Sequence, residues 1–525
     1  MNNIHILDCT LRDGGYCNNW NFGFDNVKKI INGLIEANIE IIECGFLTNK
    51  EKYNSDITKY NTLDEVSKVI PNNRDGKIFV VMINYGEYNV DDLPVYDGTS
   101  VDGIRVAFNK KNRLAALDMC NEIKEKGYLV FVQAMVSLSY NDDEFLDLIS
   151  LVNKFRPYAF YIVDSFGMMN GKDLTRLFYM VEHNLIDNIL IGFHSHNNMQ
   201  LAFSNAQRLV SEQTRKELII DSSIYGMGRG AGNLNTELFV EYLNETVGKD
   251  YYLKPILIII DEILNDIYQR NNWGYSLPNY ISATHNAHPN YASYLDNKKT
   301  LTIDDMNDIF DMMEEDKKIT YDRQYIEKLY IEYMEKGQTS KQHESVLREQ
   351  LRGKNVLLIA PGKSSIVEKD KISKIAMRSN VIAVSINHEY ECIKTDYIFL
   401  SNLRRFRKIG EEQKYKCIVT SNIHSNEVFY QVKYSDLLNN EVSVADNAGL
   451  MAIKFFSTQE IDKIYLAGFD GYSHDVGENY GNKNMTFIVK NDVLDTMNSG
   501  MSKILKKYSK IANIEFVTTP RYFKV

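Results

Sequence analysis

Residues 4–16 read IHILDCTLRDGGY, an apolar, β-branched run followed by a glycine turn that carries Arg12 and Asp13. Beyond this turn, residues 27–35 place apolar side chains at helical spacing, and a second strand-like run, IEIIECGF, covers residues 39–46. Short β-branched runs are typical of buried strands, and a period near 3.6 residues is typical of helices. The stretch therefore predicts a strand–helix–strand unit with a charged pair at the end of its first strand.

The same alternation continues to about residue 226. Strand-like runs start 26 to 38 residues apart, which is the length of one strand–helix unit. They read IHIL at 4–7, IEIIECGF at 39–46, KIFVVMI at 77–83, GIRVAF at 103–108, LVFVQAMV at 129–136, FYIVDSF at 160–166, ILIGFHSH at 189–196 and LIIDSSIYG at 218–226. Eight such units predict an α/β fold with a (β/α)8 TIM barrel over residues 1–250, and a doubly wound open sheet is the alternative.

The period breaks after about residue 250. Residues 251–350 predict a helical extension and linker that ends in the charged stretch KGQTSKQHESVLREQLRGKN. A second alternation of strands and helices then predicts a smaller Rossmann-like α/β domain over residues 351–525. Its strand-like runs are NVLLIAPG at 355–362, NVIAVSIN at 380–387, DYIFLS at 396–401, KCIVTS at 416–421 and KIYLAGFDG at 463–471.

Composition excludes several classes of protein. The chain has 525 residues, of which 44% are hydrophobic and 25% charged, and its net charge is -10. A negative charge argues against a nucleic-acid or anionic-membrane surface. The apolar run PILIII at 255–260 is too short to span a bilayer. Six scattered cysteines without a CxxC pair, and an N-terminus without signal-peptide character, favour a cytoplasmic protein with reduced thiols.

In a barrel of this kind, working residues lie at the carboxyl ends of the strands. The polar residues at these predicted ends should therefore converge on one mouth. They are Arg12 and Asp13 after the first strand, Glu43 on the second, Asp164 and Ser165 on the sixth, His194 and His196 on the seventh, and the loop GMGRGAGN at 226–233 after the eighth.

The motif FHSHNN carries the most specific chemical signal. Residues two apart on a strand point to the same side, so His194 and His196 can both face the barrel axis. Two imidazoles and one carboxylate form a three-ligand metal site with open positions, and Asp13 is the best-placed carboxylate. A lone HxH pair is more often structural, but its place opposite Asp13 favours a divalent metal. We expect Mn²⁺, with Mg²⁺, Co²⁺ and Zn²⁺ as alternatives.

Arg12 places a fixed positive charge beside this predicted site. Arginine keeps its proton in proteins, so it suits a position where an enolate oxygen develops negative charge. Glu43 would pair with Arg12 and orient it. The alternative is that Arg12 and Glu43 form only a buried structural ion pair.

These motifs together resemble the DRE-TIM metallolyases. The shared features are TLRDG on the first strand, a glutamate ending the second, HxH on the seventh and a GxGxxxGN loop after the eighth. The resemblance covers about residues 1–300. Within this superfamily, LRDGG, VDSFG and the compact GMGRGAGN loop are most similar to the 4-hydroxy-2-oxovalerate aldolases.

The resemblance implies metal-dependent aldol chemistry on a 2-oxo acid, with the enolate of pyruvate as intermediate and an aldehyde as second substrate. It makes Asp13, His194 and His196 the metal ligands and Arg12 the enolate stabiliser. It also implies substrate contacts from a further set of residues, in which Asn233 aligns with a metal-ligating asparagine of the lyase branch and Tyr291 with a substrate-contacting tyrosine. This set is Asp164, Ser165, Asn233 and Tyr291; packing of the helical region is the alternative role of Tyr291.

One position departs from the aldolase pattern. The aldolases have an acid–base histidine three residues after the metal aspartate, where this chain has Tyr16. A tyrosine donates a proton readily but is a poor base at neutral pH. We therefore list Tyr16 with Arg12 and Glu43 as catalytic candidates, and the identity of the aldehyde stays open.

Two glycine-containing loops have less specific interpretations. GMGRGAGN could cradle a phosphate with its backbone amides or could simply be a tight turn past the metal site. IAPGKSS at 359–365 lacks the spacing of a P-loop or a dinucleotide site. The domain around IAPGKSS resembles Rossmann-like domains associated with bacterial surface-polysaccharide genes, which implies a nucleotide or nucleotide-sugar ligand.

The sequence thus predicts a metal-dependent carbon–carbon lyase, an aldolase of sugar-acid or surface-polysaccharide metabolism that forms a homo-oligomer. An acyl-CoA-dependent condensing enzyme or lyase of the same superfamily is one alternative, against which the short loop after the eighth strand argues. A non-catalytic scaffold is another, against which the combination of Arg12, Asp13, His194 and His196 argues.

Overall fold

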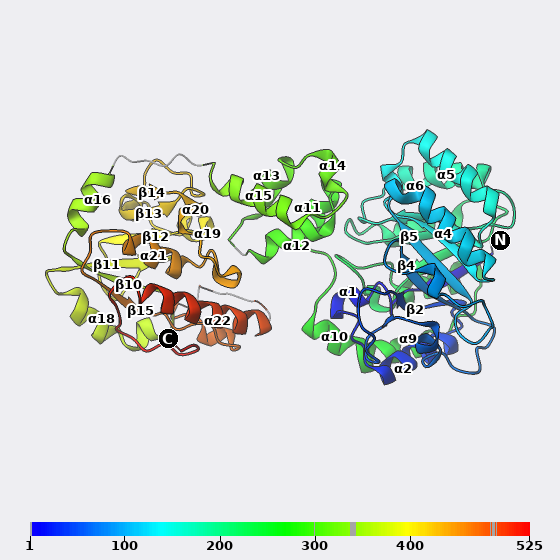
Figure 1. Ribbon diagram of the computed structural model, residues 1–525, viewed down its shortest axis with the longest axis horizontal. Coiled ribbons are helices and arrows are strands. Elements are labelled where there is room, and N and C mark those ends of the chain that lie inside the picture. Colours follow the sequence, from blue (N-terminus) through cyan, green and yellow to red (C-terminus); the bar gives the residue numbers. More distant parts are fainter. Residues whose placement is uncertain are drawn as a thin grey trace. The chain divides into compact units, whose positions relative to one another are not determined.

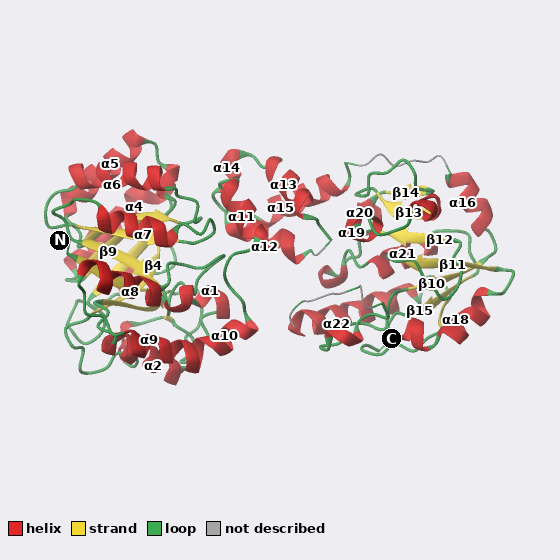
Figure 2. Cartoon of the chain, turned by 180° about the vertical axis from the view of Figure 1, so that it is seen from behind, coloured by secondary structure: helices red, strands yellow, loops and turns green. Residues whose placement is uncertain are grey.

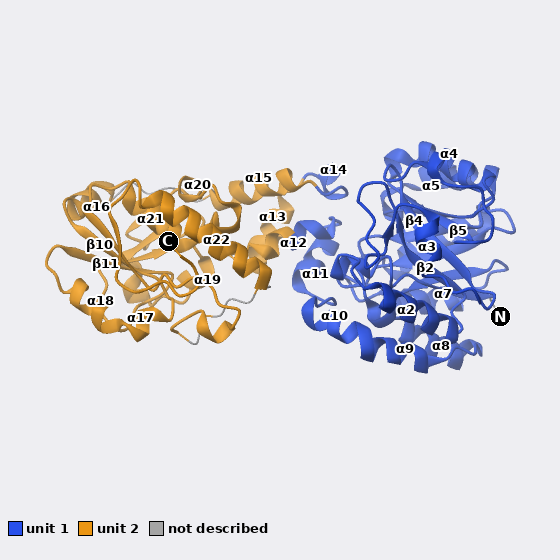
Figure 3. Cartoon of the chain, turned by 60° about the horizontal axis from the view of Figure 1, so that its bottom comes forward, with its two compact units in different colours: residues 1–293, 314–321 blue, residues 294–313, 322–525 orange. Residues whose placement is uncertain are grey.

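The computed structural model describes residues 3–298, 300–336, 343–482, 485, 489 and 491–524. Contacts divide the chain into two compact units, shown in Figure 3. The first unit contains residues 1–293 and 314–321, and the second contains 294–313 and 322–525. The stretch 251–350, predicted as a separate extension and linker, is therefore shared between the two units, and the part of its charged stretch at 337–342 lies outside the described residues.

The first unit is built on a parallel β-barrel (Figure 1). In residues 3–298, described without a gap, eight strands close into the barrel because β1 pairs with both β2 and β9, while the short β3 (Lys59–Tyr60) joins β2 outside the ring. The barrel strands are β1 Ile4–Asp8, β2 Ile41–Leu47, β4 Ile78–Asn84, β5 Gly103–Phe108, β6 Leu129–Ala134, β7 Ala159–Asp164, β8 Leu190–Ser195 and β9 Leu218–Ser222. The predicted (β/α)8 barrel is confirmed, and the open-sheet alternative is not.

Helices surround the barrel strands, as Figure 2 shows. They are α1 Gly15–Asn18, α2 Phe24–Glu36, α3 Leu63–Ser67, α4 Arg113–Glu125, α5 Asp142–Phe155, α6 Gly171–Asn184, α7 Ala202–Ser211, α8 Thr236–Val247 and α9 Leu253–Ile259. After them follow α10 Asn265–Arg270, α11 Leu277–Thr284, the first part of α12 Pro289–Asn297, and α14 Glu315–Lys318.

Local sequence explains where these helices form. In α2, the apolar face predicted from spacing is buried against the barrel, with Val27, Ile30, Ile31 and Leu34 inside. Helix α5 begins with a capping box, in which Asn141 accepts from the backbone N–H of Glu144 and the Glu144 carboxylate accepts from that of Asn141. Such caps satisfy N–H groups that the first helical turn leaves unpaired.

The barrel interior contains both apolar and charged side chains. An apolar cluster fills part of the interior; it contains Leu7, Cys9, Ile41, Val80, Phe131, Ala159, Tyr161, Val163, Leu190 and Ile219. Inward-facing charged residues from three strands, Glu43, Arg105 and Asp221, are also fully buried. Buried charges persist only when paired, so this group requires a connected network of partners.

The second unit contains a second parallel sheet. Within the described residues, seven strands lie in the order β14-β13-β12-β11-β10-β15-β16. They are β10 Asn355–Ile359, β11 Val381–Ile386, β12 Tyr397–Leu400, β13 Cys417–Thr420, β14 Tyr430–Val432, β15 Lys463–Ala467 and β16 Ile514–Phe516. The order reverses at β10, because β11 and β15 pair on its two sides. This arrangement is that of a doubly wound α/β sheet. It contains the five strands that the sequence predicted and two that it missed, β14 and β16 at the two edges.

Helices of the second unit complete the α/β pattern. They are the end of α12, α13 Ile303–Asp311, α15 Arg323–Met334, α16 Glu344–Leu351, α17 Ser364–Val367, α18 Lys369–Ala376, α19 Leu403–Phe406, α20 Tyr434–Leu437, α21 Ala448–Ser457 and α22 Asn491–Tyr508. Among helices of the described part of the chain, none has the length and apolar character needed to cross a membrane.

Candidate active site

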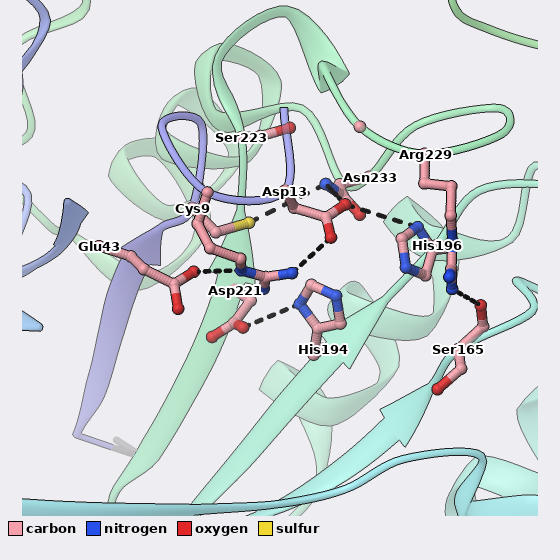
Figure 4. A network of polar contacts seen from close by, with 12 residues as sticks. Cys9, Asp13, Glu43, Ser165, His194, His196, Asp221, Ser223, Arg229 and Asn233 are labelled. Atoms are coloured by element: carbon pink, nitrogen blue, oxygen red, sulfur yellow. Dashed lines mark hydrogen bonds and ion pairs between the residues drawn. The ribbon is translucent and has the colours of Figure 1, made fainter. Parts of the chain in front are cut away.

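Three buried side chains at the carboxyl mouth of the barrel form a triad that could hold a metal ion (Figure 4). Asp13 lies in the turn after β1, His194 near the end of β8, and His196 just beyond it. One ligand atom of each lies within 4.8 Å of the other two, and Asp13 Oδ2 is 3.8 Å from His196 Nδ1. The fold thus brings together the three residues that the sequence analysis nominated.

The ring of His194 is held by Asp221, which sequence reasoning missed. His194 Nδ1 lies 2.9 Å from Asp221 Oδ2. A carboxylate can only accept at this contact, so Nδ1 carries the hydrogen and Nε2 keeps its lone pair for a metal. The sequence feature that could have identified Asp221 is its place in the strand run LIIDSS at 218–223, where an aspartate follows apolar residues.

This contact predicts the effect of Asp221→Asn. An amide is neutral, so it raises the basicity of His194 less than a carboxylate does and holds the ring less firmly. We expect Mn²⁺ to bind about 10- to 100-fold more weakly, the usual cost of losing such a supporting group. Isothermal titration measures the affinity, with the exposed Asp261→Asn as control. Equal affinity in the two variants would contradict the assigned role.

The protonation states of His196 and Asp13 suit a divalent cation. Burial lowers the pKa of His196 to about 3, despite the nearby Asp13 carboxylate, so its imidazole is neutral at pH 7. Burial favours the neutral form of Asp13, but the Arg12 guanidinium outweighs it and holds the Asp13 pKa below its usual range. Neutral imidazoles and an ionised carboxylate are the forms that bind metals.

Two polar atoms at this position lack hydrogen-bond partners in the described part of the chain. They are His196 Nδ1 and Asn233 Oδ1, and both are buried. A buried polar atom without a partner costs free energy, so such atoms mark a place where a ligand or ion completes the structure. With the triad, they fit a divalent metal.

The loop after β9 brings Asn233 onto the triad. Asn233 Nδ2 donates to Asp13 Oδ2 over 2.8 Å. A Cβ atom at Gly228 would lie 2.3 Å from Asn233 Nδ2 and 2.9 Å from Asp13 Oδ2, so only glycine allows this approach. Several loop amides already donate within the protein, including those of Gly226, Ala231 and Gly232, which favours the tight turn over the phosphate cradle.

Arg12 lies beside the triad and begins a chain of buried ion pairs. Its Nε donates to Glu43 Oε2 over 2.8 Å, and its NH1 pairs with Asp13 Oδ1. Glu43 also lies 2.7 Å from Arg105 NH1, and Arg105 pairs with Asp221. The network therefore links Arg12 to the group that holds His194.

The protein leaves one terminal nitrogen of the Arg12 guanidinium unused. Its NH2 group is buried and has no hydrogen-bond partner among the described residues. Burial opposes the charge of Arg12, but the carboxylates of Glu43 and Asp13 outweigh this and raise its pKa above the usual value. Arg12 is thus both part of a structural ion pair and a permanent cation with one unused donor beside the triad.

The neighbouring candidates on β7 differ in their surroundings. The Asp164 carboxylate accepts from the backbone N–H groups of Met168 and Met169, and burial raises its pKa to about 7 although these bonds favour the charge. Asp164 therefore holds the turn that follows the strand. Ser165 lines a cavity, and its carbonyl accepts from Arg229 NH2 over 3.0 Å.

This cavity has a volume of about 260 Å³. The triad residues do not line it, but Arg229 does and lies beside His196 (Figure 4). Tyr16 lines it, and the Arg229 guanidinium lies 5.5 Å from the centre of the Tyr16 ring. Tyr16 is 40% exposed, but the protein packed around it raises the pKa of its hydroxyl, so Tyr16 is protonated at neutral pH. His288 also lines the cavity and was missed, because its segment lies far from the barrel strands in sequence.

Tyr291 does not line this cavity. Its side chain is fully buried, and its hydroxyl lies 2.8 Å from the carbonyl oxygens of both Lys317 and Thr320. Tyr291 thus fastens residues 314–321 onto the first unit, and Thr320 and Tyr321 of that segment do line the cavity.

Comparison with known proteins finds relatives of the first unit. The family model HMGL-like matches residues 3–256. A 4-hydroxy-2-oxovalerate aldolase from Geobacillus thermodenitrificans is 25% identical over 279 residues, 50% of this chain and 79% of the relative. Another from Pelotomaculum thermopropionicum is 27% identical over 258 residues, 47% and 73% of the two chains. A crystallised N-terminal domain from Bacteroides vulgatus is 27% identical, covers 57% of this chain and 98% of that domain, and has a TM-score of 0.49.

A closed parallel barrel with an aspartate and two histidines at its carboxyl mouth defines the class, the metal-dependent aldolases and lyases of the DRE-TIM superfamily. Through residues 3–256, which hold the barrel strands and the three side chains, the chain is similar to the HMGL-like family. Its relatives named above are 4-hydroxy-2-oxovalerate aldolases, so the predicted superfamily and the resemblance to these aldolases are confirmed. The sheet of the second unit lies outside the matched residues.

Proposed function

We propose that the barrel is a divalent-metal-dependent aldolase that forms the enolate of a 2-oxo acid, pyruvate in the simplest case, and adds it to an aldehyde. The observation that supports this most is the open, buried NH2 group of Arg12 beside Asp13, His194 and His196. Arg12 cannot lose its proton, and no carboxylate of the described residues accepts from its NH2 group. Such a cation can stabilise an oxygen that becomes negative during the reaction.

Asp13, His194 and His196 would hold the metal, for which two imidazoles and one carboxylate favour Mn²⁺, with Co²⁺, Zn²⁺ and Mg²⁺ as alternatives. When bound, such an ion supplies Lewis-acid polarisation of the 2-oxo acid.

The protein side chains then have separate tasks. Arg12 donates to the enolate oxygen, and Glu43 keeps the guanidinium in its plane by accepting from Nε. The protonated Tyr16 hydroxyl is the candidate proton donor at the cavity side of the site.

We extend the proposal to the second unit, where we expect a nucleotide or nucleotide-sugar to bind. The support is the reversal of strand order at β10, because doubly wound sheets bind ligands beyond the carboxyl ends of their strands at such a point. Among the described residues the six cysteines form no disulfide, which suits the cytoplasm, and we propose a homo-oligomer acting in sugar-acid or surface-polysaccharide metabolism.

The half-reaction can be tested without knowing the aldehyde. If the barrel stabilises an enolate, the full-length protein with Mn²⁺ should exchange the methyl protons of pyruvate for deuterium from solvent. Proton NMR of the methyl signal measures the rate. Absence of exchange with every divalent metal tried would exclude the pyruvate enolate.

Tyr16→Phe tests the proton donor in the same assay. The substitution removes only a hydroxyl, so we expect packing and Mn²⁺ affinity to persist while exchange or the aldol step slows by about 100-fold or more, the range for a general acid–base group. Tyr140→Phe, which removes a hydroxyl outside the cavity lining, is the matched control. Both steps proceeding at wild-type rates in Tyr16→Phe would assign proton transfer to another group of the site.

A further inference from the structure

The cavity beside the triad carries more hydrogen-bonding groups than the enolate reaction uses. Its wall includes residues at the ends of β4 and β5, the loop after β9 and residues 319–321, all within the first unit. Among the lining residues are three asparagines, Asn84, Asn109 and Asn112, together with Glu87. The groups on this wall indicate which aldehyde the cavity accepts.

Two hydrogen-bond donors face each other in the part of the cavity next to the triad. His288 Nδ1 accepts from the backbone N–H of Asn290 over 3.2 Å, so the hydrogen of the neutral ring is on Nε2. Burial lowers the pKa of His288 to about 3, which agrees with a neutral ring. Its Nε2 lies 3.5 Å from Arg229 NH1, which is also a donor.

A pair of donors at this separation cannot satisfy each other. Arg229 is held in place through NH2, which donates to the Ser165 carbonyl, and Figure 4 shows it beside His196. An oxygen atom between Arg229 NH1 and His288 Nε2 would accept from both. In this neutral form His288 acts as a donor and not as a base, so its role is to bind an oxygen that carries negative charge.

The asparagines offer both donors and acceptors to the rest of the cavity. Within the described residues, the side chains of Asn109 and Asn112 make no hydrogen bond, and Asn84 makes one, from Nδ2 to Glu87 Oε2 over 3.1 Å. Each amide has two N–H donors and an acceptor oxygen, which is the combination that matches hydroxyl groups. An alkyl chain would leave these groups without partners.

The cavity is too large to be filled by a very small molecule. A cavity of roughly 150 Å³ holds benzene, with six heavy atoms. The cavity here, at about 260 Å³, has room for a chain of several carbons with its oxygens. A two-carbon aldehyde would leave most of it filled with water.

We propose that the acceptor is a hydroxylated aldehyde of three or more carbons, an open-chain aldose, and that Arg229 and His288 bind its carbonyl oxygen. The inference rests on the proposed aldolase function. In the condensation, the enolate methylene carbon forms a bond to the aldehyde carbon, and the C=O π pair moves to the oxygen between Arg229 and His288. The alkoxide takes up one proton, which balances the one lost from the methyl group.

The test compares aldehydes of equal chain length in the presence of pyruvate and Mn²⁺. D-glyceraldehyde is paired with propanal and D-erythrose with butanal, and kcat/KM is measured for each. We expect the hydroxylated member of each pair to react at least about 100-fold better, because polar groups in a site reject an analogue that leaves them unpaired. Equal or better reaction of the alkyl aldehydes would overturn the inference.

Variants of the cavity wall link this preference to particular groups. Asn112→Leu should reduce the ratio of kcat/KM for erythrose over butanal by about tenfold, and Asn121→Leu, on the outer helix α4, should leave that ratio as in the wild type. His288→Phe should lower kcat/KM for both aldehydes, and His288→Gln, which keeps an N–H donor, should restore part of it. An unchanged ratio in Asn112→Leu, or equal effects of the two His288 variants, would count against the assignment.

Failure of this inference can be told from failure of the proposed function. Deuterium exchange into pyruvate by the wild-type protein tests the first half-reaction alone. Exchange together with a preference for alkyl aldehydes would overturn only the acceptor class. Absence of exchange would remove the aldolase proposal and this inference with it.

Discussion

The double variant His194→Ala/His196→Ala is expected to lose bound Mn²⁺ and all measurable enolate chemistry. Only Asp13 of the triad would remain, and a single carboxylate binds a divalent ion far more weakly than three converging ligands. We expect the affinity for Mn²⁺ to fall by more than about 100-fold, because the loss of a group that only supports a metal ligand already costs up to about 100-fold. Metal content after gel filtration and isothermal titration measure the loss, and deuterium exchange into pyruvate measures the activity.

The fold should survive this change, because both histidines lie at the barrel mouth and neither belongs to the apolar cluster of the interior. His183→Ala is a matched control, since that imidazole is exposed on α6. Circular dichroism should give the same spectrum for all three proteins. Equal metal content in the wild type and the double variant would exclude the site.

The fold could be predicted because local sequence patterns mark its strands and helices. Each barrel strand is a short β-branched run, and each intervening helix buries one stripe, as Val27, Ile30 and Leu34 do in α2. The site was predictable for a related reason: in a parallel barrel every carboxyl end reaches the same mouth, so Asp13 and His194 meet although 180 residues separate them.

Other features depend on contacts that no local pattern encodes. Arg105 sits in the middle of the strand run GIRVAF and is fully buried, which is tolerated only because Glu43 and Asp221 reach it from two other strands. Thr320 joins the cavity because Tyr291 fastens residues 314–321, a segment distant in sequence from the barrel strands. Such residues are found only when tertiary partners are known.

Arg12→Lys is expected to lower the rate of deuterium exchange by roughly 100-fold or more, the cost of removing a donor to a developing anion. The guanidinium pairs through Nε with Glu43 and through NH1 with Asp13, and its NH2 is buried without a hydrogen-bond partner among the described residues. A lysine ammonium is a single compact point of charge and cannot occupy the three positions together. Metal affinity should persist, because Asp13, His194 and His196 are retained.

This variant also separates the two interpretations of Arg12. Arg74→Lys controls for replacing an arginine by a lysine, because Arg74 pairs with Asp102 away from the triad. If Arg12 only completes a buried ion pair, the substitution should lower the melting temperature and leave exchange per folded molecule unchanged. If Arg12 stabilises the enolate, exchange should fall even at temperatures where the variant is fully folded. Near wild-type exchange in folded Arg12→Lys would leave Arg12 with the structural role alone, because the open NH2 group is the feature that lysine cannot reproduce while it pairs with Glu43.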